Sequence, residues 1–130
     1  MNDRFKFRIW NGSEMHYNDF VVTATGYVGK ITEEFLDKCV FNQEDLTADK
    51  ECTLMQCTGL KDKNGKLIYE GDIVKCSYGF NYYIGTVVWD SEYIQFSIEV
   101  EKELYSFNQR SKNDLIEAIG NIYENPEALN

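Results

Sequence analysis

The chain has 130 residues, of which 43% are hydrophobic and 15% aromatic, and its formal net charge is −9. A chain of this length can bury one hydrophobic core and fold without disulfides, and the aromatic content favours strands over helices. The negative charge repels a phosphate backbone, which argues against a general nucleic-acid binder. We expect a cytoplasmic protein, because no stretch has the roughly eighteen uncharged apolar residues of a membrane span and the N-terminus has no apolar signal region.

The opening residues, RFKFRIW, alternate between charged and apolar side chains, which predicts a half-buried strand over residues 4–10. The apolar residues Phe5, Phe7 and Ile9 would share the buried face. The exposed face would carry three cations, Arg4, Lys6 and Arg8. This local excess of positive charge makes the strand a candidate surface for weak nucleic-acid binding.

Other segments of the N-terminal part have patterns of their own. Short strands are predicted over residues 15–17 and 20–28. Apolar residues recur at helical spacing over residues 32–42, which predicts a short helix. The polar and acidic stretch 43–51 is typical of a solvated connector.

The tract from Met55 to Val74 is rich in turn signals. Its Asn64-Gly65 pair supplies the left-handed backbone of a tight hairpin turn, and a short strand is predicted over residues 67–69. The sequence DKNG within the tract is similar to the middle of a calcium-binding loop, but the acidic first and last ligands of such a loop are missing. We therefore interpret the tract as a hairpin followed by the start of a strand.

Further strands are predicted in the C-terminal part, over residues 73–76, 82–89, 93–100 and 104–107. Gly85 would mark a β-bulge. The strand over 93–100 alternates strictly, and its inward-facing residues would be Ile94, Phe96, Ile98 and Val100.

The segment 115–123 fits either a strand or a helix begun by Asn113. Gly120 and the extended-chain preference of the residues after it favour the strand. Asn125 and Pro126 would then start a last helical turn, as its cap and its first residue.

Short strands about eight to twelve residues apart, joined by Gly- and Asn-bearing turns, are typical of a small barrel or sandwich. The predicted fold is mainly β, with one short helix. A Src-homology-3-like barrel would occupy residues 55–130, after a strand region and connector in residues 1–54. The order of EGDIVKC, IGTVVWD and an alternating strand is that of many such barrels.

Two separated motifs, MQCTGLKDKNGKLIYEGDIVKC and EAIGNIYENPEAL, resemble the YopX family of phage and prophage proteins, and RFKFRIW at the start fits the same family. The resemblance implies one YopX-like domain over residues 1–130, with a β-barrel in its C-terminal part. It also implies a phage or prophage source and residence in the bacterial cytoplasm. It implies no activity, and no catalytic or binding residues follow from it.

Candidate catalytic and metal-binding residues are few. The four cysteines, Cys39, Cys52, Cys57 and Cys76, contain no CxxC pair and lie far from the lone histidine in sequence, so we expect free thiols and neither a metal nor a cofactor. His16 has no feature that singles it out as a catalytic base. Glu70 and Asp72 could hold a magnesium ion, but Asp72 at a strand entrance more often caps a turn.

Aromatic residues cluster around one predicted turn, at Tyr78, Phe80, Tyr82 and Tyr83. No basic residue lies between Cys76 and Glu101, so a protein interface or the core suits these rings better than stacking on bases. The leading hypothesis is a non-enzymatic module that binds a protein partner or itself. Nucleic-acid binding through Arg4, Lys6 and Arg8 is the alternative, and a carboxylate-metal enzyme ranks last.

Overall fold

The structure is a computed structural model that describes residues 2–18, 20–22, 28–30, 53–107 and 115–130. The chain divides into two compact units. One comprises Met1–Lys6 and Gln56–Asn130, and the other Phe7–Met55. The first six residues therefore belong with the C-terminal part of the chain. Among the described residues, no helix has the length and apolarity needed to span a membrane.

In the smaller unit, strands β1 (Phe7–Trp10) and β2 (Met15–His16) form an antiparallel hairpin, and β3 (Phe20–Val22) pairs with β4 (Val28–Lys30). The Asn11 side-chain oxygen closes the first hairpin by accepting bonds from the backbone N–H groups of Ser13 and Glu14. The helix predicted over residues 32–42 and the connector after it lie outside the described residues.

The strand predicted over residues 4–10 begins only at Phe7. Residues Asp3–Phe5 form a short 3-10 turn, because the Asn2 side chain caps it by accepting a bond from the Arg4 N–H. Within β1 both Arg8 and Ile9 are buried, so the strand has no solvated charged face. Arg4 and Lys6 are exposed as predicted but precede β1, and Arg8 is buried, so the three cations do not share one exposed strand face.

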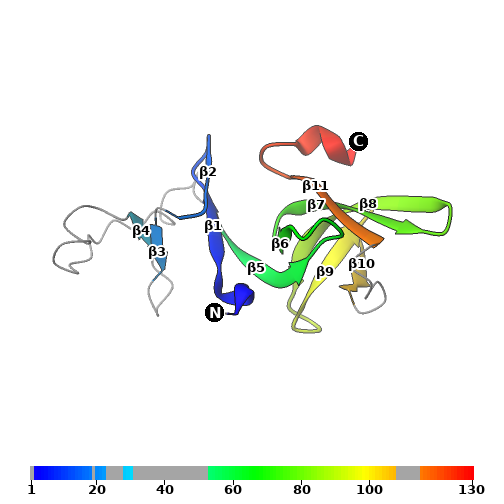
Figure 1. Ribbon diagram of the computed structural model, residues 1–130, viewed down its shortest axis with the longest axis horizontal. Helices are drawn as coiled ribbons and strands as arrows, with labels where there is room; N and C mark the ends of the chain where they lie inside the picture. Colours follow the sequence, from blue (N-terminus) through cyan, green and yellow to red (C-terminus); the bar gives the residue numbers. More distant parts are fainter. Residues whose placement is uncertain (1, 19, 23–27, 31–52, 108–114) are drawn as a thin grey trace. The chain divides into compact units, whose positions relative to one another are not determined.

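The larger unit is built of antiparallel strands (Figure 1). Strand β5 (Thr53–Lys61), which begins in the other unit, forms a hairpin with β6 (Leu67–Tyr69). A five-stranded sheet follows in the order β10-β9-β8-β7-β11 and curls into a half-barrel. Its strands are β7 (Asp72–Tyr78), β8 (Asn81–Asp90), β9 (Gln95–Val100), β10 (Glu103–Ser106) and β11 (Ile116–Asn121). The mainly β prediction is confirmed.

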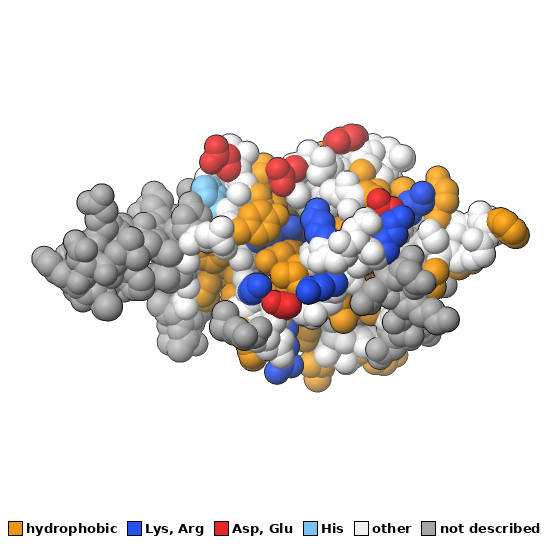
Figure 2. Space-filling view, viewed as in Figure 1, with side chains coloured by type: hydrophobic (Ala, Val, Ile, Leu, Met, Phe, Trp, Pro, Cys, Tyr) orange, Lys and Arg blue, Asp and Glu red, His pale blue; other side chains and the backbone are white. Residues whose placement is uncertain are grey.

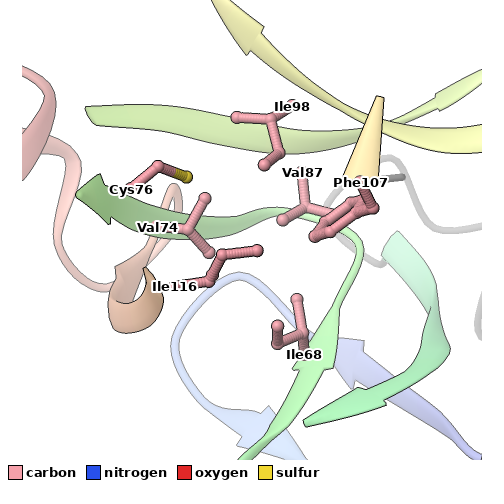
Figure 3. Packing of buried hydrophobic residues seen from close by; sticks show 7 residues of the cluster. All are labelled: Ile68, Val74, Cys76, Val87, Ile98, Phe107 and Ile116. Carbon is pink, nitrogen blue, oxygen red and sulfur yellow. The ribbon is translucent and has the colours of Figure 1, made fainter. Parts of the chain in front are cut away.

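The core of the larger unit lies where β6 packs against the sheet (Figure 3). Its buried side chains are Ile68, Val74, Cys76, Val87, Ile98, Phe107 and Ile116. Cys57 and Cys76 are buried free thiols, as predicted, and burial raises the pKa of Cys57. Cys39 and Cys52 lie outside the described residues.

The turn between β5 and β6 is organised by the carboxylate of Asp62. This buried side chain accepts bonds from the N–H groups of Asn64, Lys66 and Ala118, each at 2.9 Å. Burial raises the pKa of Asp62, but the three N–H bonds outweigh burial and lower the pKa below its usual value. The predicted hairpin is confirmed, and its turn is also tied to β11.

Three predictions about β8 and the strands after it are decided by the structure. Residues 116–121 form a strand, as preferred over a helix, and Asn125 and Pro126 occupy the predicted positions at the start of a 3-10 turn, Pro126–Leu129. The bulge predicted at Gly85 is absent, since β8 keeps its register with β7 there. A Cβ atom at Gly85 would lie 2.7 Å from the Glu99 carbonyl oxygen, so this glycine permits a close approach of β9.

The strand predicted over residues 93–100 begins two residues later, at Gln95. The Asp90 carboxylate accepts bonds from the N–H groups of Glu92 and Tyr93, and this side-chain turn extends the β8–β9 connection. Ile94 therefore lies in the connection, 75% exposed, and not in the core as predicted. Ile98 is buried as predicted, and so is Ser97 beside it.

Candidate functional site

The β7–β8 hairpin ends in exposed aromatic rings. Phe80, at the turn, has a relative exposure of 109%, and Tyr78 and Tyr82 on either side are also exposed. Gly79 holds the turn with φ of 58°, a conformation that favours glycine. Figure 2 shows hydrophobic side chains, in orange, at the right-hand end of the molecule, where this hairpin ends in Figure 1.

The four aromatic residues predicted to cluster here lie on two faces of the hairpin. Tyr83 packs against the core and contacts the rings of Tyr78, at 6.0 Å between centroids, and Tyr105, at 5.6 Å. Tyr82 points the opposite way, because successive residues of a strand alternate, and the Lys75 ammonium lies 4.4 Å from the centre of its ring. The four rings therefore do not form one flat stacking platform, and the exposed ones are those of Tyr78, Phe80 and Tyr82.

The sequence around the turn of this hairpin contains no charged residue, and the Lys75 ammonium lies beside it, over the Tyr82 ring. No Asp, Glu, Lys or Arg lies between Lys75 and Asp90, although charged residues make up 27% of the chain. Exposed apolar surface that lacks charge is typical of a protein contact. We define residues 78–82 as the hairpin tip.

The cations predicted to share a strand face are not brought together on one. Arg4 lies in the 3-10 turn of the larger unit, and Lys6 makes an ion pair with Asp3 at 3.0 Å, which lowers the pKa of Asp3. Arg8 is buried in the smaller unit. The structure thus removes the face on which the nucleic-acid alternative was based.

Glu70 and Asp72, the candidate metal ligands, both accept backbone bonds. An Asp72 carboxylate oxygen lies 2.8 Å from the Tyr69 nitrogen, and a Glu70 oxygen lies 3.1 Å from the Gln56 nitrogen. Across the described part of the chain, no three His, Cys, Asp or Glu side chains are grouped so that they could hold a metal ion. His16, in the smaller unit, lies 2.9 Å from the Asn11 amide nitrogen. These bonds give the three residues structural roles.

A groove of about 360 Å³ in the larger unit was not found by sequence reasoning. Its apolar lining comes from Phe5, Trp89, Ile94 and Phe96. Trp89 and Phe96 are opposite one another in the β8–β9 pair, and their rings pack edge to face with 5.1 Å between the ring centroids. The groove therefore has a rigid aromatic wall at the end of the hairpin that β8 and β9 form.

The polar lining of the groove comes from one cation, Arg4, and from Gln56, Thr58 and Gln95. The Gln56 amide donates a bond of 2.7 Å to the Arg4 carbonyl oxygen, which ties the 3-10 turn to β5. The Arg4 guanidinium lies 5.0 Å from the centre of the Phe5 ring. We call this feature the Arg4 groove. The sequence carries one signal for this groove, which is that pairing of β8 with β9 can place Trp89 opposite Phe96.

Ile94, in the lining of the Arg4 groove, has φ of 54°, which is unfavourable for a β-branched residue. We expect Ile94→Asn to raise the free energy of unfolding by about 1 kcal/mol, because asparagine tolerates this conformation. Urea denaturation measures the change. Tyr93→Asn, at an exposed neighbour that does not have positive φ, is the control and should give no gain. A loss of stability in Ile94→Asn would contradict strain at this position.

Comparisons with known proteins agree with this fold. No curated protein matches the chain. The crystal structure of protein yopX from Bacillus subtilis is 24% identical, with a TM-score of 0.68 and coverage of 100% of both chains. Protein EF1440 from Enterococcus faecalis is 26% identical, with a TM-score of 0.61 over 96% of this chain and 97% of the other. The model of the YopX protein family matches residues 6–130, so this chain belongs to the YopX family.

Proposed function

We propose that this protein is a non-catalytic interaction module that contacts another protein, or a second copy of itself, through the hairpin tip. The observation that carries the proposal is the full exposure of Phe80 at an uncharged turn. An apolar ring in water is unfavourable, and burying it against a partner recovers the transfer free energy. The partner would be a phage or host protein of the bacterial cytoplasm.

The rest of the hairpin supports a contact function. Tyr83 is fixed between Tyr78 and Tyr105, so the hairpin is anchored on the core while its tip projects. Such a tip loses little conformational freedom on binding, which favours affinity. The roles of Glu70 and Asp72 as acceptors of backbone bonds support the non-catalytic part of the proposal.

We expect Phe80→Ser to weaken the contact by about 2 kcal/mol or more, roughly a 30-fold rise in Kd, because a central aromatic anchor is a typical hot spot. Tagged protein expressed in the bacterial host would be used to capture partners, and light scattering would report self-association. The thermal midpoint should not change, since Phe80 is fully exposed.

Tyr93→Ser is the matched control, because Tyr93 is also an exposed aromatic but lies in the β8–β9 connection, away from the tip in sequence. It should leave the contact intact. A strictly monomeric protein that captures nothing would refute the proposal, and so would a contact that Phe80→Ser leaves unchanged.

A further inference from the structure

We infer that the Arg4 groove binds a peptide segment that presents a carboxylate next to a bulky apolar side chain. This is a second site, separate from the hairpin tip in the residues that form it. The segment's carboxylate would pair with the Arg4 guanidinium, and its apolar side chain would pack on Trp89 and Ile94.

The charge of the groove selects an anionic ligand. Among the residues that the structure describes, Arg4 is the one charged side chain in the lining, and no carboxylate lines it, although the chain as a whole is acidic. Around the same turn, Asp3 is neutralised by Lys6, and Lys61 also acts on Asp3 electrostatically. An arginine offers two parallel N–H donors to a carboxylate, which gives geometric selectivity as well as attraction.

The backbone of Arg4 is held in place by its surroundings. Its N–H is bonded to the Asn2 side chain at 3.1 Å, and its carbonyl oxygen accepts the 2.7 Å bond from Gln56. Two residues further along, the Lys6 carbonyl oxygen accepts a bond of 2.9 Å from the Cys57 N–H, which also ties this segment to β5. Preorganisation of this kind lowers the entropy lost on binding.

Gly59 permits the close approach of this turn to β5. A Cβ atom at Gly59 would lie 3.2 Å from the Arg4 Cβ, and Gly59 has φ of 84°. Both the space and the conformation therefore favour glycine. With the turn close to β5, Arg4 lines the same groove as Trp89 and Phe96.

The apolar part of the groove includes one residue, Ile94, with a strained backbone conformation. Ile94 lines the groove in a left-handed conformation and remains 75% exposed, although a residue such as asparagine would fit the turn with less strain. Strained residues of this kind cluster at ligand-binding positions. An exposed isoleucine that shares the lining with Trp89 and Phe96 is suited to cover an apolar ligand side chain.

A peptide suits this chemistry better than a single-stranded nucleic acid. Nucleic-acid channels carry a row of cations that follows the phosphates, together with aromatic faces open to the bases. The lining of the Arg4 groove has one cation, and its Trp89 and Phe96 rings stand edge to face, at an interplanar angle of 72°, so they do not offer parallel faces to successive bases. A peptide with one carboxylate next to one apolar side chain matches a lining of one cation beside apolar residues.

The inference can be tested by selecting random peptides displayed on phage against the immobilised full chain. We expect enrichment of Asp or Glu beside Leu, Ile, Phe or Trp. Against Arg4→Glu the selected charge should reverse to Lys or Arg, while Lys102→Glu, a charge change in the β9–β10 turn, should leave the selection unchanged. No enrichment, or the same enrichment with Arg4→Glu, would overturn the inference.

Titration of one selected peptide, labelled with fluorescein, separates this site from the other possibilities. We expect at least a tenfold rise in Kd for Arg4→Glu and for replacement of the ligand's acidic residue by its amide. Phe80→Ser should leave Kd unchanged, so failure here is distinct from failure of the hairpin-tip proposal. Ile94→Asn should weaken binding while it raises the melting temperature. Displacement of the peptide by oligo(dT) at low nanomolar concentration would show a nucleic-acid site and refute the peptide assignment.

Discussion

Replacing Gly85 by alanine should lower the free energy of unfolding by about 3 kcal/mol. The added Cβ would lie 2.7 Å from the Glu99 carbonyl oxygen and 2.7 Å from a methyl carbon of Ile98. Real Cβ atoms do not approach a backbone oxygen this closely, so β8 and β9 would have to separate. Because β8 also pairs with β7 across the same position, it cannot move without disturbing the centre of the sheet.

Urea denaturation in a Trp10→Phe background, followed by the fluorescence of Trp89, measures this loss in the larger unit. Gly65→Ala is the matched control, since a Cβ at Gly65 has no atom within 4 Å and only the backbone conformation, with φ of 80°, opposes it. That control should lose about 1 kcal/mol. Equal losses at the two glycines would show that the close approach of β9 is not the cause.

The strands that the sequence predicted well are bounded by local turn chemistry. Residues 67–69 form a strand with the predicted ends because Asn64-Gly65 precedes it and Gly71 follows it, and each of these two glycines has positive φ. Gly and Asn adopt such conformations at little cost, whichever tertiary structure surrounds them. Local signals of this kind can be read without knowing which segments meet.

The errors arose where a side chain outside the apolar pattern determines the backbone. Alternation over residues 4–10 suggested one strand, but the Asn2 side chain caps a turn that ends at Phe5. In the same way, bonds to Asp90 draw Ile94 out of the predicted strand. The competing principle in both cases is side-chain capping of backbone N–H groups, which a two-residue periodicity does not detect.

The two candidate sites differ in how far the sequence could reveal them. The hairpin tip is local, and its aromatic residues are visible between Lys75 and Asp90. The Arg4 groove joins the N-terminal turn, the middle of β5 and the end of the β8–β9 hairpin. Only the fold brings these segments together, so the sequence could indicate the Trp89–Phe96 pair but not the groove.

The carboxylate of Asp62 should be worth about 3 kcal/mol to the folded state, because Asp62→Ala removes the acceptor of three N–H groups. Two of these bonds close the β5–β6 turn, and the third ties the turn to β11 at Ala118. The Lys63 N–H, which donates to the Ile116 carbonyl oxygen at 2.8 Å, should lose its alignment as well. Urea denaturation at pH 7 measures the loss, and Glu127→Ala, at an exposed carboxylate, is the control. A change of less than about 0.5 kcal/mol in Asp62→Ala would contradict this role.

The same carboxylate should make stability depend on acid pH. The pKa of Asp62 is lower in the folded protein than its ordinary value of 3.8, because three N–H bonds stabilise the ionised form more than burial disfavours it. The unfolded chain therefore takes up the proton more readily, and stability falls as the pH decreases from the unfolded pKa through the folded one. Asp62→Asn has no such proton to bind, so the stability difference between the wild type and this variant should be largest above about pH 5 and shrink towards pH 2. A difference that stays constant over this range would show that the ionised carboxylate is not what holds the turn to β11.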